Sequence, residues 1–415
     1  MNRILGITAE YDPFHTGHAY QLEQAIRRAQ PEAVVCVMSG DFMQRGEPAV
    51  LDKWTRARIA AEQGIDLVLE LPFMYACNRA EKFASGAVDM LVSCGVTHIS
   101  FGCEAEQPEE LRLLAGGQFA KQEEIESMTR DYMKAGYSRA KSAELVSRKL
   151  FGDQMTDLML MPNNILALEY LKRTRWWEEA RGVKIQSVPV RRHGSGYRSA
   201  SPETGFAGGT AIRQMIVSGQ DIAAYLSYEK EGLNWISLPD AQQRLYRLVR
   251  AMILSRSRSE LAGIYCVGEG IENRLIKEAI RCETYEEFLS EMVSKRYTAA
   301  AIRRIMIYIL MNVGEMPVCR PYGRVLAASE AGRALLHELR DGSGDPEAPE
   351  IKKARESRGR GPKLTAISGN QQIEGLPDEM REAVLLDQKA ADMFHLICDQ
   401  PLDALSDARQ RPWMG

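Results

Sequence analysis

The chain has 415 residues, of which 45% are apolar and 26% are charged, and its formal net charge is −3. At about 100–200 residues per domain, this length predicts two to three domains with ample core. The composition excludes collagen-like and disordered classes, and no apolar run approaches the ~18 residues of a membrane span. The overall charge does not indicate a nucleic-acid partner, although a local basic surface remains compatible with it.

The cysteines and the first ten residues indicate the cellular compartment in which the protein is expected. The eight cysteines are widely spread, and none forms a C-x-x-C pair, so neither a zinc ribbon nor a disulfide framework is predicted. The first ten residues reach an acid at Glu10, which is too early for the apolar core of a signal peptide. These features favour a cytoplasmic protein with reduced thiols and no contact with a membrane.

The first half alternates apolar runs with helical patterns. Strands are predicted at residues 3–8, 33–38, 66–71 and 97–101, and helices at residues 17–29, 53–63 and 82–94. Continuous apolar strands separated by helices predict an α/β fold with a doubly wound parallel sheet. Such sheets bind ligands beyond the carboxyl ends of their strands, so the functional residues are expected in the loops that follow them.

The pattern changes further along the chain. We predict a mostly helical region at residues 105–182, a last strand at 183–190, a short helix at 210–218 and largely helical structure over 220–340. The change favours a catalytic domain at residues 1–220 and a mainly α-helical domain at residues 221–415. A stretch rich in glycine, proline and charge predicts an exposed loop near residues 341–362.

The loop after the first strand carries the strongest functional signal. Residues 10–18 read E-Y-D-P-F-H-T-G-H and place two histidines around a glycine at the start of a helix. A helix N-terminus attracts anions, and Gly17 allows a ligand to approach the backbone. His15 and His18 would donate hydrogen bonds to phosphoryl oxygens as negative charge grows on them. This pattern predicts attack on the α-phosphate of a nucleotide; the alternative is two unrelated surface histidines near a turn.

These residues form the H-x-G-H signature and resemble the nucleotidylyltransferase superfamily. That superfamily typically adds a Ser/Thr-x-Ile-Arg motif at a later helix start, for which residues 208–213, G-G-T-A-I-R, are the candidate. The resemblance implies that Thr210 binds the β- and γ-phosphates and that Arg213 compensates their charge. The alternative is that Thr210 is an ordinary N-cap of an amphipathic helix.

A narrower resemblance covers nearly the whole chain. Residues 11–18, 38–49 and 66–72 closely resemble the tRNA(Met) cytidine acetate ligase family of Firmicutes-type bacteria, and later segments do so at residues 101–104, 162–166, 191–197 and 295–298. The resemblance implies that acetate attacks ATP to give acetyl-adenylate and pyrophosphate. The acetyl group then moves to the exocyclic amine of the wobble cytidine of elongator tRNA(Met). One departure is Asp12, where the family usually has asparagine.

The resemblance also implies a set of ATP-binding residues, with His15 and His18 as the catalytic pair. The loop would wrap ATP, Gly102 would lie against the adenosine, Asn163 would bind through its amide, and an arginine after the last strand would pair with the phosphates. From the sequence alone, Gly102 also fits a turn and Asn163 a helix start. The full set is Ile7, Thr8, Ala9, Glu10, Tyr11, Asp12, Pro13, Phe14, His15, Thr16, Gly17, His18, Ala19, Tyr20, Gly102, Asn163, Arg191, Arg192, Thr210 and Arg213.

Other residues are candidates for acetate or tRNA. Four follow the second strand and its loop, and five form a basic and aromatic stretch later in the chain; each also fits a solvated or structural role. These residues are Ser39, Gly40, Asp41 and Lys53, and then Lys295, Arg296, Tyr297, Arg303 and Arg304. Basic residues at 352–363 and the basic–aromatic group at 173–177 are further candidates for RNA contact. Magnesium is expected to accompany ATP, and no protein metal site is predicted.

Two other functions remain open at this point. A small-molecule nucleotidylyltransferase would use the same histidines to join AMP or CMP to a phosphorylated metabolite, and Asp12 slightly favours it. A catalytically silent nucleotide- or RNA-binding module is the third possibility, although such a module needs no donors for a transition state. The sequence leaves the oligomeric state open.

Overall fold

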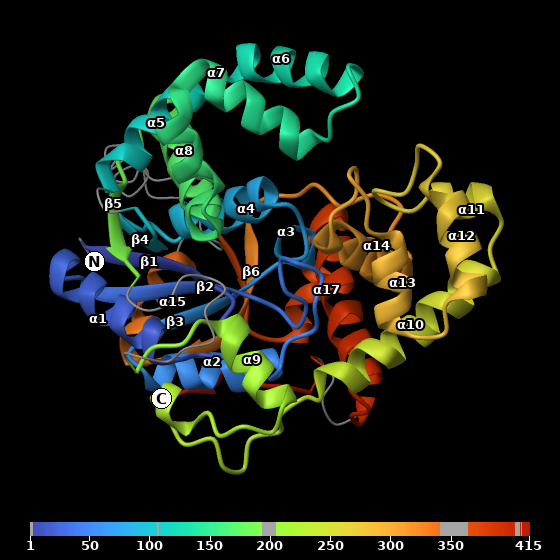
Figure 1. Cartoon of the computed structure of the whole chain (residues 1–415). Helices are drawn as coiled ribbons and strands as arrows, with labels where there is room; N and C mark the ends of the chain where they lie inside the picture. Colours follow the sequence, from blue (N-terminus) through green and yellow to red (C-terminus); the bar gives the residue numbers. More distant parts are fainter. Residues whose placement is uncertain (1–2, 106–107, 193–204, 341–363, 403–406, 408) are drawn as a thin grey trace.

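The computed structural model describes residues 3–105, 108–192, 205–340, 364–402, 407 and 409–415. Within these residues the strands form one eight-stranded sheet in the order β5-β4-β1-β2-β3-β6-β7, with β8 beside β6 (Figure 1). The strands are β1 (Ile4–Ala9), β2 (Ala33–Ser39), β3 (Leu67–Leu71), β4 (His98–Cys103), β5 (Gln186–Arg191), β6 (Tyr322–Ala328), β7 (Thr365–Ile367) and β8 (Trp413–Met414).

The first five strands confirm the expected doubly wound layer. They are parallel, and the chain builds β2 and β3 on one side of β1 before it crosses to β4 and β5 on the other. Every residue of β2 and β3 is buried, which explains their continuous apolar sequences. The strand order reverses between β1 and β4, and this is where doubly wound sheets bind their ligands.

Helices cover the sheet and join its strands. The helices of the first half are α1 (Thr16–Ala29), α2 (Lys53–Glu62), α3 (Phe73–Ala76), α4 (Ala80–Ser93), α5 (Pro108–Ala120), α6 (Gln122–Lys134), α7 (Arg139–Leu160), α8 (Pro162–Arg181) and α9 (Gly209–Val217). The predicted helical region at 105–182 is confirmed as α5 to α8. Of these, α6 and α7 extend away from the rest of the molecule (Figure 1).

The second half is mainly helical, as expected. It contains η1 (Ala223–Tyr225), α10 (Leu238–Leu254), α11 (Arg258–Ala262), α12 (Ile271–Arg281), α13 (Tyr285–Met292), α14 (Ala299–Met311), α15 (Glu330–Arg340), η2 (Asn370–Gly375) and α17 (Asp378–Ile397). Helices α10 to α14 and α17 gather around a separate core that includes Tyr246, Phe288 and Tyr308, beside the sheet (Figure 1).

The expectation of largely helical structure over 220–340 is confirmed, but the region also holds a strand that the sequence analysis did not predict. Strand β6 pairs antiparallel with β3, and β7 and β8, from further along the chain, pair with β6. All seven residues of β6, Y-G-R-V-L-A-A, are buried, and a short apolar run of this kind does not distinguish a strand from a buried helix by its period. The second half therefore completes the sheet of the first, and the boundary at residue 220 stays a prediction.

Three other expectations concern the cysteines, membrane-spanning helices and the loop at residues 341–362. All eight cysteines lie in the described part and none is in a disulfide. Over the described ranges, every helix is too short or too polar to cross a membrane. The predicted loop at 341–362 lies outside the described residues.

Candidate active site

His15 caps the helix that follows β1. The Gly17 N–H donates to His15 Nδ1 at 3.1 Å. A neutral imidazole that accepts at Nδ1 carries its proton on Nε2. His15 Nε2 is buried and has no hydrogen-bond partner among the described residues. Gly17 is required here because a Cβ at its position would lie 2.9 Å from the His15 ring. The cap therefore leaves one N–H of His15 available to an incoming acceptor.

His18 stacks on His15. The two ring centroids are 3.7 Å apart with an interplanar angle of 27°, and Tyr11 and Phe14 pack against His18 at 4.9 Å and 5.6 Å. Burial lowers the pKa of His15 to about 3, with Arg192 and Arg213 adding to the effect. Burial lowers the pKa of His18 well below its usual value, and the adjacent His15 ring and Arg192 further disfavour a proton there. Both rings are neutral donors at physiological pH.

Asp12 does not face an open phosphate site. Its Oδ1 accepts from the Val50 N–H at 2.8 Å, and its carbonyl oxygen accepts from Arg213 Nη1 at 2.7 Å. Its Oδ2 lies 3.4 Å from the same guanidinium nitrogen. An asparagine oxygen accepts the Val50 bond equally well, so the departure from the family pattern keeps this contact. Asp12 consequently gives no support to the small-molecule alternative.

The late motif contacts the histidine loop although Arg213 and Asp12 are 201 positions apart in the sequence. Arg213 lies on α9 and binds the loop through Asp12, and its Nη2 donates to Thr210 Oγ1 at 3.4 Å. The N-cap of α9 is Gly208, which has no capping side chain. The alternative role of Thr210 as an N-cap is therefore wrong. Thr16 Oγ1 donates to the Gly205 carbonyl at 3.3 Å and brings the start of α9 against α1.

A second group lies beyond β4 and β5. Asn163, at the start of α8, accepts from Arg192 Nη1 through Oδ1 and donates to Glu104 through Nδ2. A Cβ at Gly102 would lie 3.3 Å from Arg192 Cγ, so the arginine stem covers this glycine. The structure thus brings Gly102, Asn163 and Arg192 together. Arg191 is the last residue of β5, and its side chain is exposed.

Two residues of this region were not assigned from the sequence. Asn164 is fully buried, and its Oδ1 accepts from the Glu104 N–H at 2.8 Å, which fixes the segment that carries Glu104. Arg56 on α2 is also fully buried and donates to the carbonyl oxygens of Glu10, Ser39 and Gly40. Arg56 therefore joins the carboxyl ends of β1 and β2. A single arginine in an amphipathic pattern gives no sequence signal for such a role.

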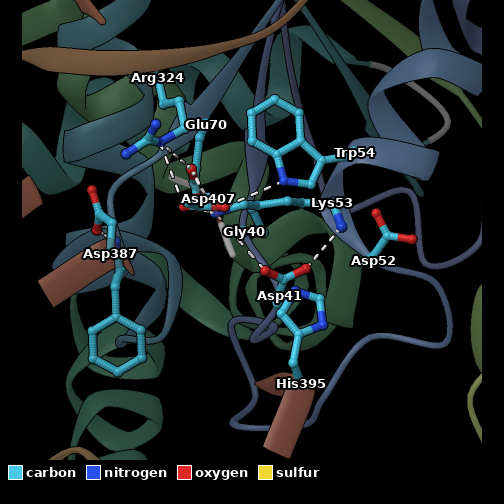
Figure 2. A network of polar contacts seen from close by, with 12 residues as sticks. Gly40, Asp41, Asp52, Lys53, Trp54, Glu70, Arg324, Asp387, His395 and Asp407 are labelled. Carbon is cyan, nitrogen blue, oxygen red and sulfur yellow. Dashed lines mark hydrogen bonds and ion pairs between the residues drawn. The ribbon is translucent and has the colours of Figure 1, made fainter. Parts of the chain in front are cut away.

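Asp41 and Lys53 belong to a buried ionic network rather than to a surface (Figure 2). Lys53 Nζ donates to Glu70 Oε1 at 2.8 Å and to Asp407 Oδ2 at 2.7 Å, and Lys53 N–H donates to Asp41 Oδ1 at 2.8 Å. Lys53 is 1% exposed and Asp41 is 3% exposed. Neither side chain reaches solvent, so neither is placed for contact with tRNA. The distant acids that neutralise Lys53 were not visible in its local sequence.

Gly40 lies at the edge of the same network. A Cβ at its position would lie 2.5 Å from Glu70 Oε1. Burial raises the pKa of Glu70 to about 8, against the lowering effect of Lys53. Ser39 ends β2, and its Oγ is buried without a hydrogen-bond partner among the described residues. Of the four candidates for an acetate pocket, Ser39 is the one whose side-chain oxygen is left without a hydrogen-bond partner among the described residues.

The basic candidates for tRNA divide into two groups. Arg303 Nη1 lies 2.9 Å from Glu47 Oε1, and Arg304 Nη1 donates to the Gln44 carbonyl at 3.1 Å, so both face the loop after β2. Lys295 and Arg296 are exposed, and Arg296 pairs with Glu269. Tyr297 is half-buried and packs against the helical core.

The basic–aromatic group on α8 holds the fold together. Arg173 makes two hydrogen bonds of 2.7 Å to Asp89 and lies over the Trp176 ring at 4.0 Å, and Trp177 Nε1 donates to the same carboxylate at 2.7 Å. These side chains pack α8 on α4. The basic segment 352–363 lies outside the described residues.

Comparison with known proteins agrees with this geometry. The family model for HIGH nucleotidyl transferases matches residues 1–407. A tRNA(Met) cytidine acetate ligase of Caldanaerobacter subterraneus subsp. tengcongensis is 36% identical, covering 81% of this chain and 86% of the relative. One of Caldicellulosiruptor saccharolyticus is 35% identical, covering 82% and 85%. This chain belongs to the tRNA(Met) cytidine acetate ligase family.

A solved structure extends the agreement to the whole fold. The crystal structure of Thermotoga maritima TmcAL bound with alpha-thio ATP is 26% identical, with a TM-score of 0.82 over 99% of both chains. The chain therefore has the same architecture as that protein, and its stacked histidines lie at the switch point of the sheet.

Proposed function

We propose that this chain activates acetate with ATP and transfers the acetyl group to the exocyclic amine of the wobble cytidine of elongator tRNA(Met), in the cytoplasm. The observation that carries the proposal is the neutral His15–His18 stack at the N-terminus of α1, where the buried Nε2–H of His15 has no hydrogen-bond partner among the described residues. The names of the relatives supply the substrates. Neutral donors at a helix start suit an α-phosphate that gains negative charge.

In the first step, a carboxylate oxygen of acetate attacks the α-phosphorus of ATP. The new O–P bond forms as the bond to the bridging oxygen breaks, and pyrophosphate leaves with the electron pair. His15 and His18 donate to the α-phosphate oxygens, where charge accumulates. Arg213, which donates to the Asp12 carbonyl at 2.7 Å, and Arg192, which covers Gly102, would pair with the triphosphate.

In the second step, the cytidine N4 amine attacks the acetyl carbonyl carbon. The acyl C–O bond to the phosphate then breaks, AMP leaves, and the amine loses one proton. No water takes part, and an acetylated cytidine results. The histidines remain hydrogen-bonded to the departing phosphate, which stabilises AMP as the leaving group.

Magnesium was expected to enter with ATP. The two acids of the histidine loop already accept backbone hydrogen bonds. Asp12 accepts from the Val50 N–H, and Glu10 accepts from the Gln44 N–H at 2.6 Å. Over the described ranges, no group of three histidine, cysteine or acidic side chains is arranged to hold a metal ion. These residues do not form a magnesium site of their own, and we expect the ion to be held by phosphate oxygens and water.

The first test is pyrophosphate exchange into ATP, without RNA, in the presence of acetate, propionate, formate or no acid. Exchange that depends on acetate supports acyl-adenylate formation and excludes a binding module. If no acid supports exchange even after tRNA is added, the proposed activation is wrong. A phosphorylated metabolite is then the acceptor to test, because a small-molecule nucleotidylyltransferase would release the same pyrophosphate.

The second test concerns the tRNA surface. We place tRNA contacts in the mainly helical region 221–415, at the exposed Lys295 and Arg296 before α14. The double variant Lys295→Ala/Arg296→Ala should weaken tRNA binding several-fold and leave acetate-dependent exchange unchanged. Lys121→Ala/Lys134→Ala, which removes two exposed charges from α5–α6, is the matched control. Equal tRNA affinity of the two double variants would contradict this assignment.

A further inference from the structure

The loop between β2 and α2 connects the ATP site with the helical region. Gln44 marks the connection: its N–H donates to Glu10 Oε1 at 2.6 Å, and its carbonyl accepts from Arg304 Nη1 at 3.1 Å. Glu10 immediately follows β1, and Arg304 lies on α14. One loop residue therefore contacts both the histidine loop and the helical region.

Glu47 makes a second, parallel connection through charge. Its Oε1 lies 2.9 Å from Arg303 Nη1 on α14, and its Oε2 lies 4.0 Å from Arg213 Nη2 on α9. The carboxylate is thus shared by two guanidinium groups from different parts of the fold. Its side chain is 19% exposed, so solvent screens these contacts only in part.

The backbone fixes Glu47 in this position. Gly46 has a φ of +77°, and a Cβ there would lie 2.5 Å from the Arg304 backbone nitrogen. The loop therefore lies directly on α14 at this point. Within the loop, the Met43 N–H donates to the Glu47 carbonyl at 2.8 Å, and the Gly46 N–H to the Met43 carbonyl at 2.9 Å. These contacts fix the backbone at Glu47, from which the carboxylate reaches Arg303 and Arg213.

We propose that Glu47 is a positioning residue that holds Arg213 ready for the triphosphate of ATP. The inference rests on the proposed function, because it assigns Glu47 to the arginine that pairs with phosphate. Arg213 donates to the Asp12 carbonyl at 2.7 Å on one side and faces Glu47 on the other. Arg303 balances the second carboxylate oxygen and keeps Glu47 between the two arginines.

The physical reason is electrostatic preorganisation. Without the negative charge of Glu47, Arg213 and Arg303 repel each other across the loop. The Arg213 side chain would then be fixed only when ATP binds. The loss of side-chain entropy on binding would weaken the affinity for ATP. Arg213 pairs with phosphates in the ground state and in the transition state alike. Loss of its positioning should therefore raise the KM for ATP and change kcat little.

The experiment measures acetate-dependent pyrophosphate exchange as a function of ATP concentration. Glu47→Gln keeps the shape and removes the charge, and it should raise the KM for ATP about fivefold with kcat changed less than about twofold. Glu47→Asp restores the charge and should recover most of the loss. The matched control is Glu62→Gln, which breaks an exposed glutamate–arginine pair at 3.1 Å on α2 and should leave both constants unchanged.

A second variant separates positioning from a general loss of structure. Arg303→Gln should raise the KM for ATP in the same direction, although Arg303 is not among the residues assigned to ATP. The double variant should be no worse than Glu47→Gln alone, because both act through one carboxylate. If Glu47→Gln and Arg303→Gln both match Glu62→Gln in the KM for ATP, the inference is wrong. If wild-type protein shows no acid-dependent exchange, the proposed function fails instead.

Discussion

Lys53 and Asp407 lie 354 positions apart in the sequence, and the distance between Lys53 Nζ and Asp407 Oδ2 is 2.7 Å. Lys53 begins α2, directly after the loop that follows β2, while Asp407 belongs to the C-terminal segment. Asp407 also accepts from Trp54 Nε1 at 3.2 Å, and Arg324 lies 3.5 Å from the same carboxylate (Figure 2). Asp407 therefore contacts the start of α2 and β6 together.

These contacts predict a large effect of Lys53→Ala on stability. The substitution leaves Glu70 and Asp407 buried without their main counter-charge, which should lower the free energy of unfolding by about 3–5 kcal/mol. Urea unfolding followed by circular dichroism measures the change. Lys121→Ala, at an exposed lysine 3.9 Å from Glu124, is the control and should have little effect. Equal unfolding midpoints for the two variants would contradict a stabilising network.

His15→Ala and His18→Ala should each reduce acetate-dependent pyrophosphate exchange by about 10²–10³-fold. Each variant removes a donor to the α-phosphate, so kcat should fall more than the affinity for ATP. Calorimetric titration with ATP provides the affinity, and the thermal unfolding midpoint shows whether each variant is folded. Unchanged turnover in both variants would disprove the assigned roles.

Stability should decrease in acid because of His15. The pKa of His15 is lowered in the folded protein to about 3, below its value of about 6.5 in an unfolded chain. The unfolded state therefore takes up a proton first as the pH falls. The stabilising contribution is complete above about pH 6.5 and is lost progressively towards pH 3, with about 2 kcal/mol lost between pH 7.5 and pH 5.

His15→Gln tests this pH dependence, because glutamine does not titrate. Urea unfolding of the two proteins at pH 7.5, 6 and 5 gives the difference in free energy at each pH. The free energy of unfolding of the wild type, relative to that of His15→Gln, should fall by about 2 kcal/mol between pH 7.5 and pH 5. A constant difference would show that His15 is not held neutral by the fold.

Asp12→Asn should preserve acetate-dependent exchange to within a few-fold, because the amide oxygen can still accept from the Val50 N–H. Asp12→Ala should lower the free energy of unfolding by about 1–3 kcal/mol, since it leaves a buried N–H without a partner. The two variants form a matched pair, measured by exchange and by urea unfolding. A strong loss of exchange in Asp12→Asn would show that the carboxylate charge matters for catalysis.

The sequence predicted the parallel layer and the position of its loops well. Strands β1 to β5 agree with their apolar runs within a few residues, because strands in the interior of a parallel sheet are rich in apolar residues. The histidine loop was found for a similar reason: the spacing of His15, Gly17 and His18 is local, and the helix start fixes their arrangement. Local signals of this kind depend on no distant contact.

The residues that the sequence did not reveal depend on distant partners. Arg56 is assigned only by its four carbonyl acceptors, and Lys53 is neutralised by Glu70 and Asp407 from other parts of the chain. Strand β6 was missed because the period of a short, fully buried run does not distinguish a strand from a buried helix. Burial of these groups is decided by tertiary packing, which a local pattern does not record.

The antiparallel pairing of β3 with β6 has a consequence for the order in which the protein matures. Asp66 and Ser329 are joined by a 2.7 Å hydrogen bond across a separation of 263 positions. While the ribosome is still making the residues between them, β3 has an uncovered edge with free backbone groups, which invites pairing with other chains. The sheet that the first part of the chain begins is thus covered at this edge only when β6, in the last third of the chain, has been made.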